Sequence, residues 1–219
     1  MNKLNIPMAA GWLPALALLV AATGCSITER SRELGNPAVP GVATAQQVCS
    51  TCHGVDGNST SPQFPKLAGQ QKDYLVSQLK NFRGHDRLDP PGPEYMWGLS
   101  HNLSDEQVEA IAEYFNAQPP MRPNGANSEA VGAGMQIYRQ GIPEKEVPPC
   151  QSCHGPDGQG LAGFPRLAGQ HANYVLRQLH VFQETNFRPG TPMAQVTHLL
   201  TAEQMKDVAL FLQAFPAAQ

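Results

Sequence analysis

The sequence predicts an all-α protein built from two tandem, small helical domains. Three observations support this fold class. They are a long internal repeat, apolar residues at helical spacing in matching places of both copies, and the lack of the alternating Val/Ile/Thr-rich segments typical of strands. With 219 residues, 41% of them hydrophobic, the chain is long enough for two small domains. Its 20 glycines and 20 prolines indicate much loop.

The first 24 residues have the features of an export signal. Lys3 supplies a small positive charge, and a short apolar stretch runs from Ile6 to Thr23 with Pro14 inside it. A signal peptide fits this stretch better than a membrane-spanning helix does. Cys25 follows small residues, which resembles a bacterial lipobox. We therefore expect a periplasmic protein held to the membrane by lipid at Cys25, with an ordinary cleavage site as the alternative.

Composition predicts where the remaining boundaries fall. After the signal peptide at 1–24, of lipoprotein type, residues 25–41 are expected to form a polar tether, 42–120 the first domain, 121–128 a linker and 129–219 the second domain. The linker follows from the run Pro119-Pro120-Met121-Arg122-Pro123-Asn124-Gly125, because proline and glycine are typical of connecting segments.

The repeat consists of motifs that occur twice in the same order. The first motif, Cys49 to Gly54, recurs as Cys150 to Gly155. The second is Phe-Pro-(Lys/Arg)-Leu-Ala-Gly-Gln, at 64–70 and 164–170. A repeat unit of this size is a small domain and not a solenoid module. Further matched positions are Tyr74 and Tyr174, Gln78 and Gln178, Leu79 and Leu179, Phe82 and Phe182, Met96 and Met193, His101 and His198, and Leu103 and Leu200.

Helices are predicted in equivalent places of both units. Residues 73–82 and 173–182 carry apolar residues at helical spacing. The last helix of each unit begins at a capping box, Ser104-x-x-Gln107 in the first and Thr201-x-x-Gln204 in the second. Domains with so few short helices have thin cores, so a large apolar group inside each would stabilise it.

Each copy of the first motif is a Cys-x-x-Cys-His run, the covalent attachment pattern of haem c. Two thiols about one helical turn apart can reach the two vinyl groups of one porphyrin, and the adjacent histidine can bind the iron. We expect each helical domain to be wrapped around a covalently bound haem, which gives two haem c groups. The first would be held by Cys49, Cys52 and His53, and the second by Cys150, Cys153 and His154.

Three other uses of these cysteines are less well supported. A zinc site needs four ligands in tetrahedral geometry, whereas each repeat offers two cysteines and one adjacent histidine. A thioredoxin-like redox pair would need a βαβ context that is missing. Two disulfides are conceivable in an oxidising compartment, but they would leave the repeated histidines unexplained.

The second axial ligand of each iron must come from later in the repeat. Met96 and Met193 are the matched candidates, each shortly before the last helix. A thioether ligand opposite histidine raises the reduction potential. His101 and His198 are also matched and are the alternative ligands, although a surface or hydrogen-bonding role is favoured for them. The unmatched histidines His85, His171 and His180 are expected on the surface.

The charge pattern limits the choice of partners. The formal net charge is −3 and no basic block occurs, so nucleic-acid binding is not expected. No Ser/His/Asp set, phosphate-binding loop or paired carboxylate site emerges, so no small-molecule substrate is expected. From Ala45 to Pro120 there are nine acidic residues against five Lys/Arg, a balance of −4, whereas Ala133 to Gln219 has six of each. The acidic first domain would therefore suit basic partner surfaces, although scatter over solvated faces is the simpler interpretation.

Taken together, these motifs resemble the dihaem cytochrome c4 family over residues 42–217. The resemblance implies two class I cytochrome c domains with their haems close together. It implies a carrier in a bacterial respiratory chain, between a quinol–cytochrome c reductase or a dehydrogenase and a haem-copper terminal oxidase. It assigns Met96 and Met193 as axial ligands, and Pro65 and Pro165 as positions whose carbonyls orient the haem histidines. The loop Pro90-Pro91-Gly92-Pro93-Glu94-Tyr95 departs from the family pattern, and the stiffness of its prolines alters the approach of Met96 to the first iron.

Three classes of function are consistent with these features. An electron carrier that is not itself an enzyme is favoured, because a methionine on each iron would close it to substrate. The alternative is the cytochrome subunit of a periplasmic dehydrogenase complex or, with less support, a dihaem peroxidase, which needs an open or displaceable iron site. A structural or sensory haem module is disfavoured, since no signalling domain is attached.

Overall fold

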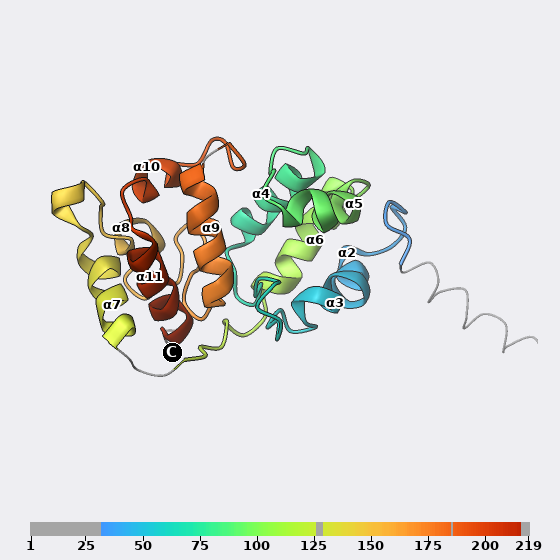
Figure 1. The fold of residues 1–219 in the computed structure, drawn as a ribbon. Helices are drawn as coiled ribbons and strands as arrows, with labels where there is room; N and C mark the ends of the chain where they lie inside the picture. Colours follow the sequence, from blue (N-terminus) through green and yellow to red (C-terminus); the bar gives the residue numbers. More distant parts are fainter. Residues whose placement is uncertain (1–31, 126–128, 185, 216–219) are drawn as a thin grey trace, which may run out of the picture.

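Helices are the regular structure of this protein. The computed structural model describes residues 32–125, 129–184 and 186–215, and in these ranges two isolated β-bridges are the nearest approach to a strand. The helices form two groups that lie side by side (Figure 1). This arrangement confirms the predicted all-α fold with two helical domains. No helix in the described ranges has both the length and the apolar character needed to cross a bilayer.

The first group starts with a continuous helical run through the first Cys-x-x-Cys-His motif. Its elements are α2 (Gly41–Thr44), the π-helix η1 (Ala45–Cys49), α3 (Ser50–His53), α4 (Lys72–Arg83), the π-helix η2 (Gly92–Met96), α5 (Trp97–Ser100) and α6 (Asp105–Asn116). The second group separates its first helix from the motif by a loop. Its elements are α7 (Glu129–Gln140), the 3-10 turn η3 (Pro143–Lys145), α8 (Gln151–His154), α9 (Ala172–Glu184), α10 (Met193–Thr197) and α11 (Ala202–Ala214).

The predicted helices lie where their sequence patterns indicate. The helices expected at 73–82 and 173–182 are α4 and α9, each slightly longer at both ends. Both capping boxes are formed: Ser104 accepts a hydrogen bond from the backbone N–H of Gln107, and Thr201 accepts one from Gln204. Capping satisfies backbone donors that a helix leaves unpaired at its start. The last helix of each domain therefore begins at the residue that the sequence predicts.

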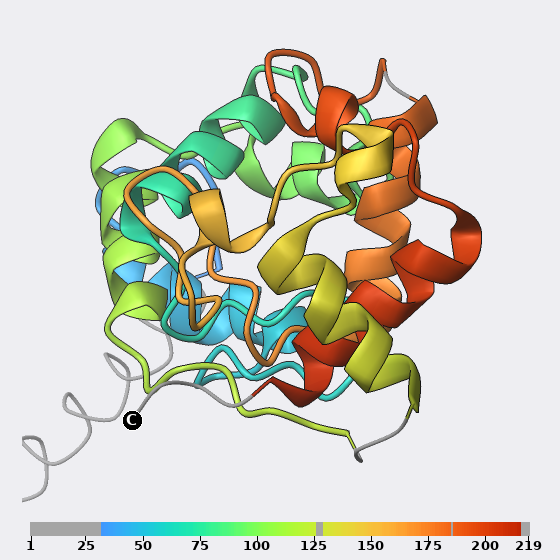
Figure 2. The same cartoon turned by 90° about the vertical axis from the view of Figure 1, so that its left-hand side faces the viewer.

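One long helix organises the core of each domain. In the first domain α6 packs against α2 and α4, and in the second α11 packs against α7 and α9. Figure 2 shows α7 and α11 crossing at the front of the second domain. The buried face of α6 includes Val108, Ile111 and Phe115, and that of α11 includes Val208 and Leu212. Both faces belong to core clusters against which Cys49 and Cys150, the first cysteine of each motif, pack.

Parts of the predicted tether and linker are not free chain. The side-chain amide of Gln107 donates hydrogen bonds to the carbonyls of Asn36 and Val39, at 3.0 and 2.9 Å, so the end of the predicted tether is fixed to α6. In the predicted linker Met121 is fully buried. Asn124 donates its backbone N–H to the Gln213 carbonyl at 2.9 Å. Composition identified these segments as connections but could not show what they pack against.

The repeated Phe-Pro-(Lys/Arg)-Leu-Ala-Gly-Gln segments form the contact between the domains. The Gln70 side chain accepts the backbone N–H of Arg166 at 2.6 Å and donates to the Arg166 carbonyl at 3.0 Å. Gln170 forms the mirrored pair with Lys66. The motif that marks the repeat in the sequence therefore also joins the two copies.

His171 corrects a prediction. It was expected on the surface because it has no matched histidine, yet only 6% of it is exposed. Its Nε2 donates to the Ser59 carbonyl at 2.8 Å, across the domain boundary. The matched residue in the first copy, Gln71, donates to the Gln159 carbonyl at 2.8 Å. His171 and Gln71 thus form equivalent hydrogen bonds across the domain boundary with different side chains. A search for identical residues in the two repeats cannot detect this match.

Candidate functional site

Each Cys-x-x-Cys-His motif folds into a single helical turn. In the first domain Cys49 ends η1, while Cys52 and His53 lie in α3. In the second domain Cys150 caps α8, which contains Cys153 and His154. Residues three apart on a helix share a face, so the two thiols of each motif point the same way. The turns end at Gly54 and Gly155, where φ values of 81° and 82° favour glycine.

The two motif histidines are held in one orientation. Nδ1 of His53 lies 2.8 Å from the Pro65 carbonyl, and Nδ1 of His154 lies 2.9 Å from the Pro165 carbonyl. A carbonyl only accepts hydrogen bonds, so Nδ1 carries the proton and Nε2 keeps its lone pair. Burial lowers the pKa of both histidines, which favours the neutral form that binds iron.

An aromatic residue supports each histidine from the side. The rings of Phe64 and His53 meet edge to face with centroids 6.3 Å apart, and those of Phe164 and His154 at 6.1 Å. The Phe-Pro pair of the second motif therefore fixes the imidazole twice, by ring packing and by the proline carbonyl. The contacts expected from Pro65 and Pro165 are present in the structure.

Met96 and Met193 line the same cavity, each at an end of a short helical element. Met96 ends the π-helix η2, and Met193 begins α10. Their carbonyls accept hydrogen bonds from Ser100 at 2.6 Å and Thr197 at 2.8 Å, and both hydroxyl residues are fully buried. Despite the proline-rich loop before it, Met96 lines the cavity as Met193 does.

One continuous cavity of about 830 Å³ contains all of these groups. Its walls are mostly apolar and include side chains from α4, α6, α9 and α11. The predicted ligand residues that line it are Cys49, Cys52, His53 and Met96 from the first domain, and Cys150, Cys153, His154 and Met193 from the second. The structure therefore brings both predicted ligand sets to one cavity that extends through the domain boundary.

The cavity walls fit a haem with its propionates. Arg166 lines the cavity and is only 6% exposed, yet its Nε and Nη2 donate to no described residue. A buried guanidinium without an acceptor is costly, so this site requires an anionic or accepting group from its occupant. A haem, which is an apolar plane with propionate carboxylates at one edge, would supply that group. Burial also raises the pKa of Cys49 and of Cys150 to about 11, so both thiols are neutral in the cavity.

The alternative ligands His101 and His198 lie outside this cavity. Both are exposed, and neither lines it. His101 lies near His85, whose ring stacks on Trp97 at 4.1 Å between centroids. Nδ1 of His198 contacts the carbonyl of Gln195 in its own turn. The positions of these two histidines favour the surface role over axial ligation.

The structure does not support a disulfide or a zinc site at the motif cysteines. The four motif cysteines are unpaired. Across the described part of the chain no three His, Cys, Asp or Glu residues come together as a metal site would require. Cys25, the predicted lipid site, lies outside the described residues.

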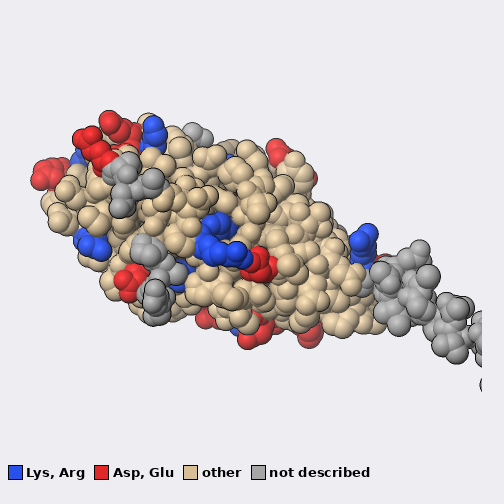
Figure 3. All heavy atoms as spheres, turned by 90° about the horizontal axis from the view of Figure 1, so that it is seen from below, with Lys and Arg blue, Asp and Glu red and all other residues tan. Residues whose placement is uncertain are grey.

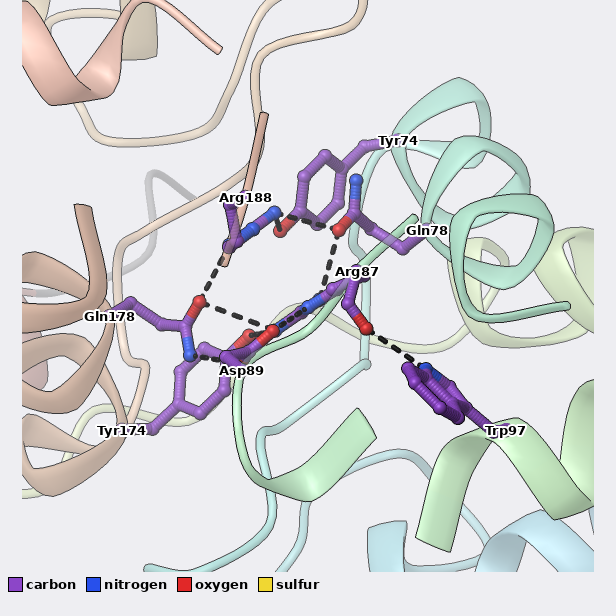
Figure 4. A network of polar contacts seen from close by, with 8 residues as sticks. All are labelled: Tyr74, Gln78, Arg87, Asp89, Trp97, Tyr174, Gln178 and Arg188. Atoms are coloured by element: carbon purple, nitrogen blue, oxygen red, sulfur yellow. Dashed lines mark hydrogen bonds and ion pairs between the residues drawn. The ribbon is translucent and has the colours of Figure 1, made fainter. Parts of the chain in front are cut away.

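Four further residues that match between the repeats line the same cavity. They are Tyr74, Gln78, Tyr174 and Gln178, and the sequence pattern alone indicates no function for them. They join Arg87, Asp89 and Arg188 in one polar network at the domain boundary (Figure 4). The repeated Tyr-x-x-x-Gln spacing was a signal, because it places both side chains on one face of α4 and of α9. The loop residues Arg87 and Arg188 carried no comparable pattern.

The surface seen in Figure 3 bears few charges. Lys/Arg and Asp/Glu occur there in small separate groups, and most of this face is uncharged. The acidic balance of the first domain is thus not gathered into one patch on this side of the molecule.

Comparison with known protein families gives two matching regions. The family described as Cytochrome c matches residues 38–118 and 132–215. A cytochrome c-552 from Acidithiobacillus ferridurans is 40% identical over 197 residues, which is 89% of this chain and 85% of that protein. A cytochrome c4 from Pseudomonas aeruginosa is 40% identical over 193 residues, 87% of this chain and 84% of that protein. A protein named thiosulfate dehydrogenase electron acceptor, from Stutzerimonas stutzeri, is 33% identical over 175 residues, covering 77% and 79%.

Solved structures show the same similarity. The cytochrome c4 of Acidithiobacillus ferrooxidans superposes with a TM-score of 0.72 at 42% identity, covering 76% of this chain and 98% of that one. A thiosulfate dehydrogenase from Marichromatium purpuratum superposes with a TM-score of 0.69 at 30% identity, covering 86% of this chain and 40% of that one. The two-domain helical arrangement is common to both.

Proposed function

Because this chain belongs to the dihaem cytochrome c4 family of electron-transfer proteins, we propose that it carries electrons in a bacterial respiratory chain, from a quinol–cytochrome c reductase or a dehydrogenase to a haem-copper terminal oxidase. Its cofactors are two covalently bound haem c groups, and it is an electron carrier, not an enzyme. The observation that carries this proposal is the single cavity that holds two equivalent sets of Cys, Cys, His and Met residues.

The proposal assigns ligands residue by residue. Cys49 and Cys52 would attach the first haem, and His53 and Met96 would ligate its iron. Cys150 and Cys153 would attach the second haem, and His154 and Met193 would ligate its iron. Each haem would supply reversible one-electron redox chemistry. The chain's part is to keep each imidazole oriented through a proline carbonyl, to exclude water with apolar walls, and to keep both iron positions closed with a thioether.

Reoxidation by an oxidase tests the proposed direction of electron flow. Reduced protein is mixed with membranes that contain a haem-copper oxidase, and haem oxidation is followed together with oxygen uptake. Both haems are expected to be oxidised while oxygen is consumed, and cyanide should stop both processes. Failure to reoxidise under conditions where another cytochrome c does would contradict an oxidase as the acceptor.

A second candidate function is service as the electron acceptor of a dehydrogenase. Relatives bear the name thiosulfate dehydrogenase electron acceptor, and a thiosulfate dehydrogenase structure contains a similar two-domain region. The matching test supplies thiosulfate and a purified thiosulfate dehydrogenase and measures reduction of both haems. Reduction at a rate comparable to that of the dehydrogenase's own partner would support this candidate.

Residues 1–31 lie outside the described structure, so their role remains a proposal from sequence. We infer that the chain is exported to the periplasm and held at the membrane by lipid on Cys25. Intact mass of the protein from cell membranes should show an acylated N-terminal cysteine, and Cys25→Ser should release the protein into the soluble periplasmic fraction. Cleavage elsewhere, with no added lipid mass, would contradict the anchor.

A further inference from the structure

A partly buried polar cluster lies at the domain boundary of the cavity, and the proposed electron transfer does not by itself account for it. We name it the arginine cluster, and it consists of Tyr74, Gln78, Arg87, Asp89, Tyr174, Gln178 and Arg188. The first four residues come from the first domain and the last three from the second. Figure 4 shows the two arginines pointing toward the same pair of glutamines.

The two glutamines link both arginines. The Gln78 side-chain oxygen accepts from Arg87 at 2.9 Å and from Arg188 at 2.7 Å. The Gln178 oxygen accepts from Arg87 at 3.2 Å and from Arg188 at 2.6 Å. Each guanidinium is therefore bonded to both domains, and their charges lie close together. Arg87 also lies 4.5 Å above the Phe82 ring, and Arg188 lies 4.9 Å above the Phe182 ring.

A single carboxylate in the cluster faces these two cations. Asp89 is fully buried and accepts from Arg87 Nε at 2.7 Å, Arg87 Nη2 at 3.0 Å and Gln178 Nε2 at 2.9 Å. Burial alone would raise the pKa of Asp89, but the hydrogen bonds and charge of Arg87 hold it below its usual value, so the carboxylate is ionised. The hydrogen bonds of Arg188 go to neutral groups: Gln78, Gln178 and Tyr74.

The imbalance comes from the loops that carry the two arginines. Each arginine lies over a phenylalanine of its own domain. Arg87 is followed by Leu88-Asp89 and Arg188 by Pro189-Gly190, so only the first loop supplies an acid to the cluster. With two arginines against one carboxylate, the side chains of the cluster together carry one excess positive charge. All of its members except Asp89 line the cavity that both ligand sets share. A charge in that place acts on both halves of the cavity.

We propose that Asp89 and Arg188, through this cluster, set the reduction potentials of both haems together. The inference rests on the proposed function, because it requires a haem in each half of the cavity. Reduction adds one negative charge to a haem, so a nearby cation stabilises the reduced form and a nearby anion destabilises it. The full burial of Asp89 and the partial burial of Arg188 strengthen both effects, since less water screens the charges than at the surface.

Substitution of the two charges should shift the potentials in opposite directions. Asp89→Asn removes the anion, and both midpoint potentials should rise. Arg188→Gln removes a cation that has no carboxylate of its own, and both midpoint potentials should fall. For a buried charge we expect on the order of a tenfold change in the equilibrium constant for reduction, about 59 mV for a one-electron couple. Opposite signs matter, because a merely loosened interface would admit water and move both variants the same way.

The chain offers matched controls of the same charge change. Glu109→Gln removes an exposed acid on α6, and Lys206→Gln removes an exposed cation on α11. Solvent screens such charges, so both midpoint potentials of each control should stay at the wild-type values. If Asp89→Asn does not fold, Arg188→Gln against Lys206→Gln decides alone, because Arg188 is only half-buried and tolerates change better.

The outcomes separate this inference from the proposed function. Shifts of the same sign in Asp89→Asn and Arg188→Gln, a shift in only one of the two midpoint potentials, or no shift beyond that of the controls would overturn the role of the cluster. If the wild-type protein shows no haem c spectrum or does not show two one-electron steps, the dihaem assignment itself is overturned. Far-UV circular dichroism and the thermal midpoint of each variant show that the compared proteins share one fold.

Discussion

Gln170 forms a two-way hydrogen-bonded pair with the backbone of Lys66 across the domain boundary. Its Oε1 accepts the Lys66 N–H at 2.9 Å, and its Nε2 donates to the Lys66 carbonyl at 2.9 Å. Both residues are buried. The side-chain amide thus satisfies a backbone donor and a backbone acceptor that would otherwise have no partner inside the protein. Together with the mirrored pair of Gln70 and Arg166, this contact fixes how the two domains meet.

Gln170→Ala should destabilise the protein through these unpaired backbone groups. Leaving a buried donor and acceptor unsatisfied costs about 1–3 kcal/mol, so the free energy of unfolding should fall by an amount of that order. Denaturant unfolding measures it. Gln136→Ala, at an exposed position of α7, is the matched control and should change the stability little. Equal effects of the two substitutions would show that the domain contact adds nothing to stability.

Replacement of the methionines tests the axial ligands one haem at a time. Met193→Ala should lower the midpoint potential of one haem and leave the other near its wild-type value, and Met96→Ala should do the same for the other haem, because thioether ligation favours reduced iron. Spectroelectrochemical titration resolves the two steps. His101→Ala and His198→Ala remove the exposed alternatives and should leave both potentials and the spectrum unchanged. A lost axial signature in the histidine variants would reverse the assignment.

His171 predicts how stability depends on pH. Burial lowers its pKa in the folded state, and the nearby Lys66 charge adds to this, although the Ser59 hydrogen bond opposes it. The unfolded state therefore binds protons more readily below the ordinary histidine pKa of about 6.5. The stability that His171 contributes is complete above that pH and is lost as the pH falls through and below it.

The first domain supplies the substitution that tests this. Gln71 occupies the matching place and makes the equivalent hydrogen bond, so His171→Gln should keep the contact and remove the titration. Thermal midpoints measured from pH 7.5 to 5 should fall more steeply for the wild-type protein than for His171→Gln. Parallel curves would contradict the prediction.

The acidic balance of the first domain predicts a salt effect on its reduction. Complementary charge raises the encounter rate of partners, and salt screens it. With a basic redox protein as donor, reduction of the first haem should slow more with ionic strength than reduction of the second. Stopped-flow traces at several salt concentrations measure both slopes. Equal slopes would mean that the acidic residues are scattered without a role in docking.

Local patterns predicted most of what lies within one domain. Both capping boxes and the helices α4, α6, α9 and α11 follow from spacing along the chain, because hydrophobic periodicity and caps are local signals. The Cys-x-x-Cys-His motifs and the matched methionines were likewise visible, and the structure brings them to one cavity.

The contacts between domains were not predictable in the same way. The burial of His171 could not be predicted, because nothing in its own neighbourhood shows that Ser59 lies opposite. Arg87, Asp89 and Arg188 lie in loops of different length, so the repeat alignment loses them just where they meet. The π-helix that ends at Met96 also has no sequence signature among the three prolines before it. In each case the missing information is which surfaces face each other in three dimensions.

The absorption spectrum of the oxidised protein, recorded together with a redox titration, tests the central claim most directly. Two haems with histidine and methionine ligands should give the weak long-wavelength band of a methionine–iron bond and two one-electron steps at high potential. Absence of that band, with both steps at low potential, would contradict the assignment of Met96 and Met193 to the irons.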